Sequence, residues 1–345
     1  MGTLKTAERR KQESVQRRLG MDRRGFIVSG VALAGGSLLA TAAGAQDNFP
    51  SRPMRLVVPF PPGGPTDIFG RRYAERLSAA LGQQLVVENR AGAGGTIGAA
   101  AVANARADGY TMLFGTSSTH VTSPLMLANP PYDPLKDFTL LVVGIVPMVV
   151  AVNPSLPART MQEFLALLKA HPGKYTFSSA GPGSINHLGG ELLKLRAGVD
   201  ALHVPYKGTN PAQLALLSGE VDFLLDTFGT ALTHHEAGKM RILATCGERR
   251  SPAAPDIPTT LELGIEDSTV TTVNVVALPS STPAAIVEVI AQATRKVMAD
   301  EDMVASLTKM SIEPVANADT AKSAAFFERE IARWAPIVRA SGVTI

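Results

Sequence analysis

Short apolar runs alternate with amphipathic stretches along the chain from about residue 52. The first unit is an apolar run at 54–60, a Pro/Gly-rich loop, and a segment at 66–81 whose apolar positions recur near helical spacing. Apolar runs bounded by turn residues predict buried strands, and the 3–4 spacing predicts helices. Gly82 is placed to end the first helix. Because this unit recurs, the sequence predicts an α/β fold with mainly parallel sheets between helices.

The same reasoning predicts the remaining elements. Strands are predicted at 54–60, 85–88, 110–115, 174–178, 202–206, 221–226 and 239–245. Helices are predicted at 66–81, 96–106, 160–170, 184–196, 210–217, 283–299, 302–309 and 318–341. Two further strand-like passages, 142–153 and 269–278, are each followed by a proline. We expect these passages to cross between two lobes, 52–147 plus 276–345 and 148–275, which would allow hinge closure over a ligand.

The amino terminus has the pattern of a secretory signal peptide. Residues 1–24 carry eight basic and three acidic residues, and the uncharged stretch 25–45 ends in Ala43-Gly44-Ala45. A charged region, an apolar run and an A-x-A site predict export, with cleavage near Ala45. Arg23-Arg24 with a phenylalanine two residues later favours a twin-arginine signal over an ordinary Sec signal. Met21 is an alternative start that would leave this signal intact.

Length, charge and cysteine content exclude several classes of protein. The chain has 345 residues, 45% of them apolar, which is enough for two lobes. Its formal charge is +3, and residues 1–24 contribute +5, which leaves −2 for the rest and no basic surface for nucleic acid. Cys246 is the only cysteine, so neither an intramolecular disulfide nor a cysteine-rich metal site is expected. No motif calls for a metal or a cofactor.

Two loops share one arrangement and are the candidate chemistry. Pro61-Pro62-Gly63-Gly64-Pro65 and Ala180-Gly181-Pro182-Gly183 each follow a strand and precede a helix. Glycine lets a backbone approach a ligand closely, and a helix start presents free N–H groups and favours an anion. Ordinary strand–helix turns have the same pattern. Two such loops from different lobes would, however, grip one carboxylate from both sides.

Polar residues near these loops have more than one interpretation. Thr66 and Ser184 stand at helix starts, where capping is the default role. Asp67 suits the first helical turn and would also tie the loop down. His187 fits an orienting core histidine better than a ligand contact. Asp226 ends a strand, where side chains of α/β sheets face the cleft, and is a candidate for a ligand amine, amide or hydroxyl.

At this point the motifs resemble the Bug family, the solute-binding proteins of tripartite tricarboxylate transporters. The resemblance covers essentially the whole chain after the leader, in order. It rests on 58–67 (VPFPPGGPTD), 88–95 (ENRAGAGG), 108–110 (DGY), 183–188 (GSINHL), 204–208 (VPYKG), 250–252 (RSP) and 256–259 (DIPT). One stretch departs from the family pattern. Where members commonly carry an aromatic residue, often Trp-x-Gly, this chain has Thr271-Thr272-Val273-Asn274-Val275.

The resemblance implies a fold of the type II periplasmic-binding class, with two lobes joined by two crossover strands. It implies a periplasmic, monomeric, non-enzymatic receptor for a small carboxylate that it delivers to membrane transporter subunits. The ligand contacts that it implies are Phe60, Pro62, Gly63, Gly64, Thr66, Asp67, Ser178, Gly183, Ser184 and His187, with Asp226 in the strand-end acidic position. The departure near residue 273 leaves the fold untouched but puts inherited ligand specificity in doubt.

Three alternatives stay open. A ligand-sensing receptor for a signalling system would share every feature above, and so would the effector lobes of a transcription regulator apart from the leader. An α/β enzyme that binds a nucleotide through Gly92-Ala93-Gly94-Gly95 is disfavoured, because the spacing is not G-x-G-x-x-G and no acidic residue ends the next strand. Hydrolase motifs, either G-x-S-x-G or H-E-x-x-H, do not occur.

Overall fold

A computed structural model describes residues 49–341, and the fold lies in the unit Pro50–Ile345. The predicted signal peptide, residues 1–45, lies outside the described residues. Within residues 49–341, no helix is both long enough and apolar enough to span a membrane. Strands in this unit form one continuous ten-stranded sheet in the order β2-β1-β3-β9-β4-β7-β5-β6, with β10 and β8 each paired to β4.

The first group of strands is parallel, as the strand–helix alternation predicts. β1 (Met54–Val58) pairs in parallel with β2 (Leu85–Asn89) on one side and β3 (Thr111–Thr116) on the other. Helix α3 (Pro65–Leu81) connects β1 to β2, begins with proline in its first turn and ends at Gly82 in the left-handed conformation. The 3₁₀ turn η1 (Ala93–Gly95) and α4 (Thr96–Ala103) lead into β3.

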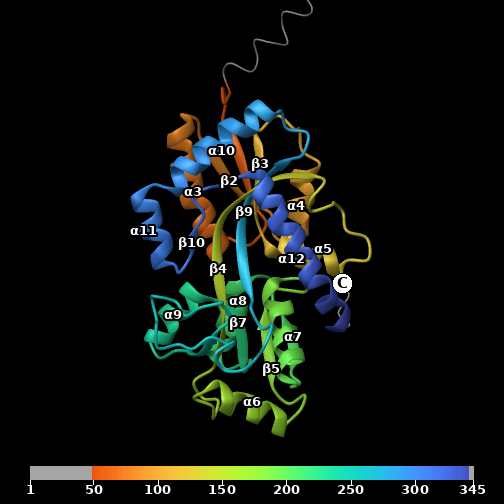
Figure 1. The fold of residues 1–345 in the computed structure, drawn as a ribbon, viewed down its shortest axis with the longest axis vertical. Helices are drawn as coiled ribbons and strands as arrows, with labels where there is room; N and C mark the ends of the chain where they lie inside the picture. The colour runs from red at the N-terminus through yellow and green to blue at the C-terminus, as the bar shows by residue number, and fades with distance from the viewer. Residues whose placement is uncertain (1–48, 342–345) are drawn as a thin grey trace, which may run out of the picture. The chain divides into compact units, whose positions relative to one another are not determined.

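Two strands connect this group to the rest of the sheet. β4 (Phe138–Val152) pairs antiparallel with β9 (Thr271–Pro279) along its first part and with β7 (Phe223–Thr227) and β8 (Arg241–Thr245) along its last part. β3 also pairs antiparallel with β9, and β10 (Glu313–Pro314) with β4. In Figure 1, β4 and β9 run side by side through the middle of the fold. The sheet is therefore mixed, with antiparallel pairing introduced by the strands that were expected to cross.

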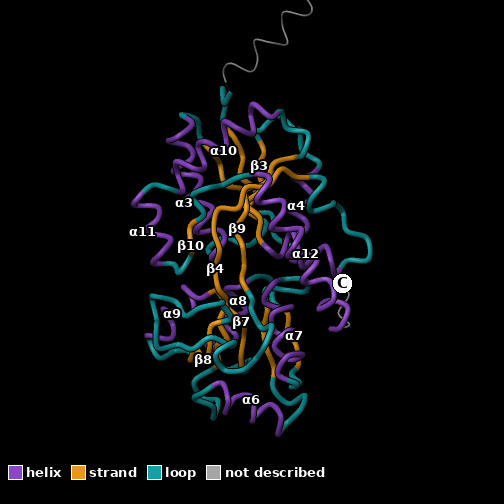
Figure 2. The backbone as a smooth tube through the Cα atoms, viewed as in Figure 1, coloured by secondary structure: helices purple, strands orange, loops and turns teal. Residues whose placement is uncertain are grey.

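The second group repeats the parallel pattern. β5 (Thr176–Ser179) pairs in parallel with β6 (Leu202–Pro205) and β7. Helices flank these strands, as Figure 2 shows. They are α6 (Met161–Ala170), α7 (Ile185–Ala197), α8 (Thr209–Ser218) and α9 (Phe228–Glu236). Phe164, Phe177 and Phe223 are fully buried and pack edge-on or stacked on one another, and each such side chain contributes about 1.5–3 kcal/mol of burial free energy.

The carboxyl-terminal helices return to the first group. α10 (Ala284–Met298) contacts α3, and α11 (Glu301–Lys309) leads to β10. α12 (Thr320–Ser341) packs on β4, on α7 and on the short helical segments η2 (Ser118–Thr122) and α5 (Ser123–Met126). Trp334 of α12 is buried.

The predicted α/β class is confirmed, and most predicted elements lie within a few residues of the observed ones. Two differ more. β4 begins at Phe138 rather than at 142, because its early residues pair with β9 out to Pro279. Helix α9 was not predicted, because it follows β7 directly at Thr227 without a glycine or proline signal. The two-lobe boundaries remain a proposal; the sheet itself is continuous across them.

Candidate functional site

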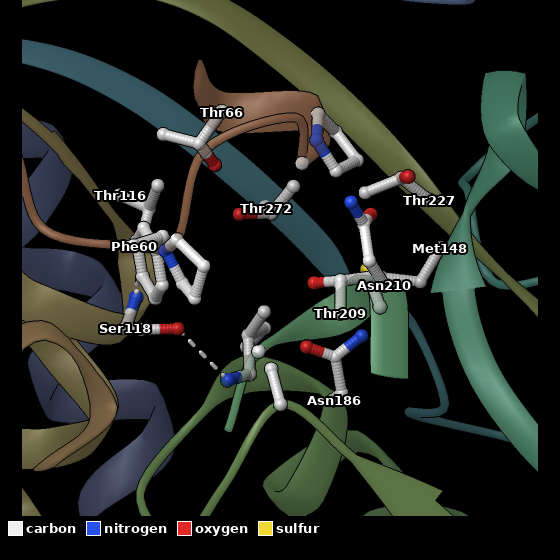
Figure 3. A pocket seen from close by; sticks show the side chains of 16 residues that line it. Phe60, Thr66, Thr116, Ser118, Met148, Asn186, Thr209, Asn210, Thr227 and Thr272 are labelled. Atoms are coloured by element: carbon white, nitrogen blue, oxygen red, sulfur yellow. Dashed lines mark hydrogen bonds between the residues drawn. The ribbon is translucent and has the colours of Figure 1, made fainter. Parts of the chain in front are cut away.

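A cavity lies where the first and second groups of strands meet, and we call it the ligand cavity. It encloses about 550 Å³ of empty space, measured out to its mouth. Figure 3 shows the side chains that surround it. Its wall consists of Phe60, Pro61, Gly64, Pro65, Thr66, Thr116, Ser118, Met148, Ala180, Ile185, Asn186, Gly208, Thr209, Asn210, Thr227 and Thr272.

The loop between β1 and α3 forms one side of this cavity. Gly64 is the N-cap residue of α3 in an extended conformation (φ −78°, ψ 166°), and no side chain caps the helix there. Pro65 has no N–H, so the N–H groups of the first turn begin at Thr66. The cavity wall includes both Gly64 and Thr66. A helix start of this kind can donate hydrogen bonds to an anion.

Asp67 holds this loop in place rather than lining the cavity. Its buried carboxylate accepts hydrogen bonds from Gly63 N (2.8 Å), Arg71 Nε (2.9 Å) and Asn89 Nδ2 (2.8 Å). Burial raises the pKa of Asp67, but these hydrogen bonds and the Arg71 charge outweigh it, so the pKa lies below its ordinary value. Asp67 therefore stays ionised and fixes Gly63 one residue before the N-cap of α3.

The loop before α7 faces the first from the opposite side. Ser184 Oγ accepts a hydrogen bond from His187 N (3.3 Å) and donates to Gly181 O (2.7 Å), so Ser184 caps α7. Ile185 N donates to Ser118 Oγ (3.0 Å), the hydrogen bond drawn in Figure 3. Ser123 Oγ donates to Gly183 O (2.9 Å). These bonds join the loop to the segment after β3 and bring Asn186 into the cavity wall.

Two further helices begin at the same cavity, which the sequence analysis did not anticipate. α8 starts after Gly208 (φ 119°), and its first residues, Thr209 and Asn210, line the wall. α9 starts after Thr227, which also lines it. Neither helix has a side-chain N-cap hydrogen bond. The N-termini of α3, α7, α8 and α9 therefore all point their positive ends toward one space.

Among residues 49–341, no charged side chain lines the ligand cavity. Its polar groups are hydroxyls of serine and threonine, amides of asparagine, and backbone N–H groups at helix starts. Within residues 49–341, no cluster of three or more His, Cys, Asp or Glu side chains is placed to hold a metal ion. The arrangement is therefore suited to binding an anion by hydrogen bonds and helix dipoles.

Asp226 is buried beside the cavity and does not line it. Its carboxylate accepts hydrogen bonds from Gln213 Nε2 (2.7 Å) and Thr227 N (2.7 Å). Burial raises the pKa of Asp226 to about 6, although these hydrogen bonds pull it down. The adjacent Thr227, not Asp226, reaches the cavity. Direct ligand contact by Asp226 remains a prediction.

We expect Asp226→Asn to stabilise the protein at neutral pH. The folded-state pKa of Asp226, about 6, exceeds the ordinary value of 3.8, so the folded state holds its proton more tightly. This carboxyl group therefore removes stability as the pH rises from about 4 to 7, at roughly 1.4 kcal/mol per pKa unit. The free energy of unfolding of the variant, measured in urea, should exceed that of wild type by about 1–3 kcal/mol at pH 7.5 and by less at pH 4.5. If the variant and wild type differed in free energy of unfolding by the same amount at both pH values, the ionised Asp226 carboxylate would not destabilise the fold.

His187 belongs to the first turn of α7, and it does not line the ligand cavity. It is buried and stacks on His203, with ring centroids 3.7 Å apart and planes 11° from parallel. Burial, with the His203 and Lys194 charges, lowers the pKa of His187 to about 3, and burial with Lys194 lowers that of His203 to about 4. Ser179 Oγ lies 2.6 Å from His203 Nε2. His187 thus occupies the core position that was favoured for it.

The structure brings only some of the predicted contacts to the cavity. Phe60, Gly64 and Thr66 line it, whereas Pro62, Gly63, Asp67, Ser178, Gly183, Ser184, His187 and Asp226 do not. Several of the latter support the loops, and Ser178 Oγ donates to Ala212 O in α8 (3.0 Å). The sequence analysis missed Thr116 and Ser118, although a polar run at the end of β3 is the same strand-end signal that identified Asp226.

Comparison with known proteins agrees with this geometry. The family model described as tripartite tricarboxylate transporter family receptor matches residues 69–343. BugT of Bordetella pertussis is 35% identical over 322 residues, which cover 93% of this chain and 98% of BugT.

Two solved structures are similar in fold and sequence. An R. palustris protein solved with adipate has a TM-score of 0.82 at 33% identity and covers 86% of this chain and 99% of its own. MatC from Rhodopseudomonas palustris, solved with bound malate, has a TM-score of 0.80 at 31% identity and covers 84% of this chain and 100% of its own.

An α/β fold of the periplasmic-binding class, with an interior cavity where its two groups of strands meet, defines a solute-binding protein. The chain belongs to the tripartite tricarboxylate transporter receptor family, which includes the Bug proteins, and the resemblance seen in its motifs is confirmed. Proteins of this family are periplasmic binding proteins, so the family indicates a location outside the cytoplasm.

Proposed function

We propose that this chain is a non-enzymatic extracytoplasmic receptor that captures a small carboxylate in the ligand cavity and delivers it to a tripartite membrane transporter. One observation carries the proposal. Four helix N-termini surround a cavity whose wall contains no charged side chain. Similar proteins solved with adipate and with malate support a carboxylate as the ligand class.

Magnitudes support anion binding without an arginine. A helix N-terminus contributes roughly 0.3–1 kcal/mol, and up to about 2 when partly buried. Hydrogen bonds to a charged group contribute about 1.5–3 kcal/mol each. A carboxylate with four or five such partners offsets the several kcal/mol needed to remove it from water. Prolines at 61 and 65 fix the first loop before binding and so reduce its ordering cost.

The cavity wall supports binding rather than catalysis. Ser118 Oγ is engaged by Ile185 N, and no histidine, cysteine or carboxylate stands beside it in the wall to activate it as a nucleophile. Cys246 is buried elsewhere, with a pKa that burial raises to about 12. The reactive thiolate is therefore suppressed at neutral pH.

The proposal includes export and partnership. We propose that residues 1–45 direct export and are removed, and that the receptor acts as a monomer on membrane subunits of the tripartite tricarboxylate type. Ligand-dependent co-purification with those subunits tests the transport role. Co-purification with a sensor kinase instead would favour signalling.

A thermal-shift panel tests the ligand class. We expect at least one acid from a panel of mono- and dicarboxylates to raise the melting temperature, and its primary amide to have no effect. At 100 times its Kd, a ligand adds about 2.7 kcal/mol to the free energy of unfolding. In a chain of this size that corresponds to a rise of roughly 5 °C. If no acid shifted the transition, or if each amide matched its acid, carboxylate binding would be rejected.

A further inference from the structure

A second cavity adjoins the ligand cavity, and we call it the side cavity. Both cavities have Pro65, Thr66, Thr227 and Thr272 in their walls, so they lie on either side of these residues. The side cavity encloses about 720 Å³ of empty space out to its mouth. Besides the shared four, its wall consists of Ile68, Val146, Gly229, Thr230, Thr233, Asn274, Lys309, Met310 and Ile312.

Strand β9 directs two polar side chains into this space. Side chains alternate across a strand, and the buried Val273 and Val275 belong to the hydrophobic core on the other face. Thr272 and Asn274 therefore point to the opposite face, where both line the side cavity. This is the stretch in which the chain departs from the aromatic pattern of its family.

Both polar side chains face the cavity without a hydrogen-bond partner among the described residues. Thr272 is 7% exposed and Asn274 is 4% exposed, and neither side chain has a hydrogen-bond partner among residues 49–341. Their polar atoms are open to the cavity and not sealed in the interior, so water or a ligand can reach them. An unpaired amide and hydroxyl that face one cavity next to a ligand site point to a polar group that both would bind.

The other residues of the side-cavity wall indicate which ligand chemistry the cavity would accept. Ile68, Val146, Met310 and Ile312 present apolar surface, and no acidic side chain lines the cavity. Lys309 is the one charged residue in the wall, and it is exposed, so water and salt screen its charge. The two buried groups are both neutral. A second carboxylate buried against one amide and one hydroxyl would be poorly compensated, whereas a hydroxyl or carbonyl oxygen would be satisfied.

We propose that the ligand extends from the ligand cavity into the side cavity, and that it is a carboxylic acid with an apolar middle and a neutral hydroxyl or carbonyl at its far end. The carboxylate lies at the helix N-termini, the apolar middle contacts Val146, Met310 and Ile312, and the far oxygen binds Asn274 and Thr272. This inference rests on the proposed function and specifies its substrate class.

Matched acids of equal length test the proposal by calorimetry. For chain lengths of four to eight carbons, we would measure the Kd of the plain acid, the terminal hydroxy acid and the dicarboxylate; hexanoate, 6-hydroxyhexanoate and adipate are one such set. At one or more lengths, the hydroxy acid should bind wild type about tenfold more tightly than the plain acid, a ratio that corresponds to about 1.4 kcal/mol.

Two variants test which residue causes the preference for the hydroxy acid. Asn274→Leu replaces the amide with apolar bulk, so the tenfold preference should disappear while the plain acid binds at least as well as before. Its melting temperature without ligand should not fall, because the amide that is removed has no partner; a purely structural role for Asn274 would lower it. Lys309→Met should leave the hydroxy acid unaffected.

Three outcomes would overturn the proposal. If wild type bound the plain acid and the hydroxy acid equally tightly, the proposed hydroxyl or carbonyl at the far end of the ligand would be rejected. The proposed binding of the carboxylate would not be affected. A dicarboxylate that binds more tightly than the hydroxy acid and loses that advantage in Lys309→Met would assign an anionic end instead. Failure of every acid to bind would overturn this inference together with the proposed function.

Discussion

Between pH 7 and pH 4.5 the free energy of unfolding should fall by about 5 kcal/mol, because the fold holds three buried or half-buried histidines in their neutral form. The pKa values of His120, His187 and His203 lie at about 4, 3 and 4, below the ordinary value of 6.5, chiefly because burial disfavours the charged ring. Protons therefore bind the unfolded chain first as the pH drops below 6.5. Each histidine then costs roughly 1.4 kcal/mol per pH unit.

The packing around each ring explains why protonation is resisted. His120 lies between Phe138 and Phe327, with ring centroids 5.1 and 5.3 Å away, and its Nε2 has no hydrogen-bond partner among the described residues. His187 and His203 stack face to face, so a charge on one ring disfavours a charge on the other. Asp226 has a raised pKa, so lowering the pH through about 6 increases the free energy of unfolding at this group. The predicted total decrease is therefore smaller than the sum of the three histidine contributions.

The measurement is urea unfolding as a function of pH, followed by the fluorescence of Trp334, the chain's one tryptophan. In His187→Leu, one titrating ring is removed, so the slope of the unfolding free energy against pH should decrease by about 1.4 kcal/mol per pH unit between pH 4.5 and 6. An unaltered slope in His187→Leu would mean that this ring is not held neutral by the fold.

Local signals explain which parts of the fold could be predicted. Helix α3 was placed within a residue of its observed bounds, because a proline at its start and a glycine at its end are local features. The extra length of β4 and the antiparallel pairing of β9 arise from contacts between residues more than 120 positions apart, which no local pattern encodes. Helix α9 has no sequence signal at its start beyond Thr227.

The candidate site was predictable to a similar degree. The glycine-rich loops before α3 and α7 were predicted to bind a carboxylate, and both contribute residues to the wall of the ligand cavity. Residues such as Met148, Asn210 and Thr272 reach the same cavity only because β4, α8 and β9 converge there. Their positions depend on tertiary packing. Conversely, Ser178 at the end of the predicted strand and Gly183 in the predicted loop were expected ligand contacts, but their polar atoms are used by α8 and by the segment after β3.

Gly64→Val should abolish carboxylate binding, lowering affinity by at least about 100-fold, while the protein still folds. The backbone at Gly64 is extended, a conformation that valine adopts readily, and a Cβ there would lie 3.7 Å from Pro61 O and 3.9 Å from Asn210 Oδ1. These are ordinary van der Waals distances, so the fold tolerates the first added carbon. The two further methyl groups would occupy space at the N-terminus of α3, where a carboxylate is expected. Losing one or two charge-assisted hydrogen bonds at about 1.5–3 kcal/mol each accounts for the predicted decrease.

A graded series separates obstruction from misfolding. The best acid from the panel would be titrated into wild type, Gly64→Ala and Gly64→Val, and affinity should fall in that order as side-chain volume increases. The melting temperature without ligand should change by no more than a few degrees across the series, since the residue lies at a helix start rather than in the core. If Gly64→Val bound the acid as tightly as wild type with an unchanged melting temperature, the N-terminus of α3 would not hold the carboxylate. The remaining helix starts, at α7, α8 and α9, would then have to bind it without α3.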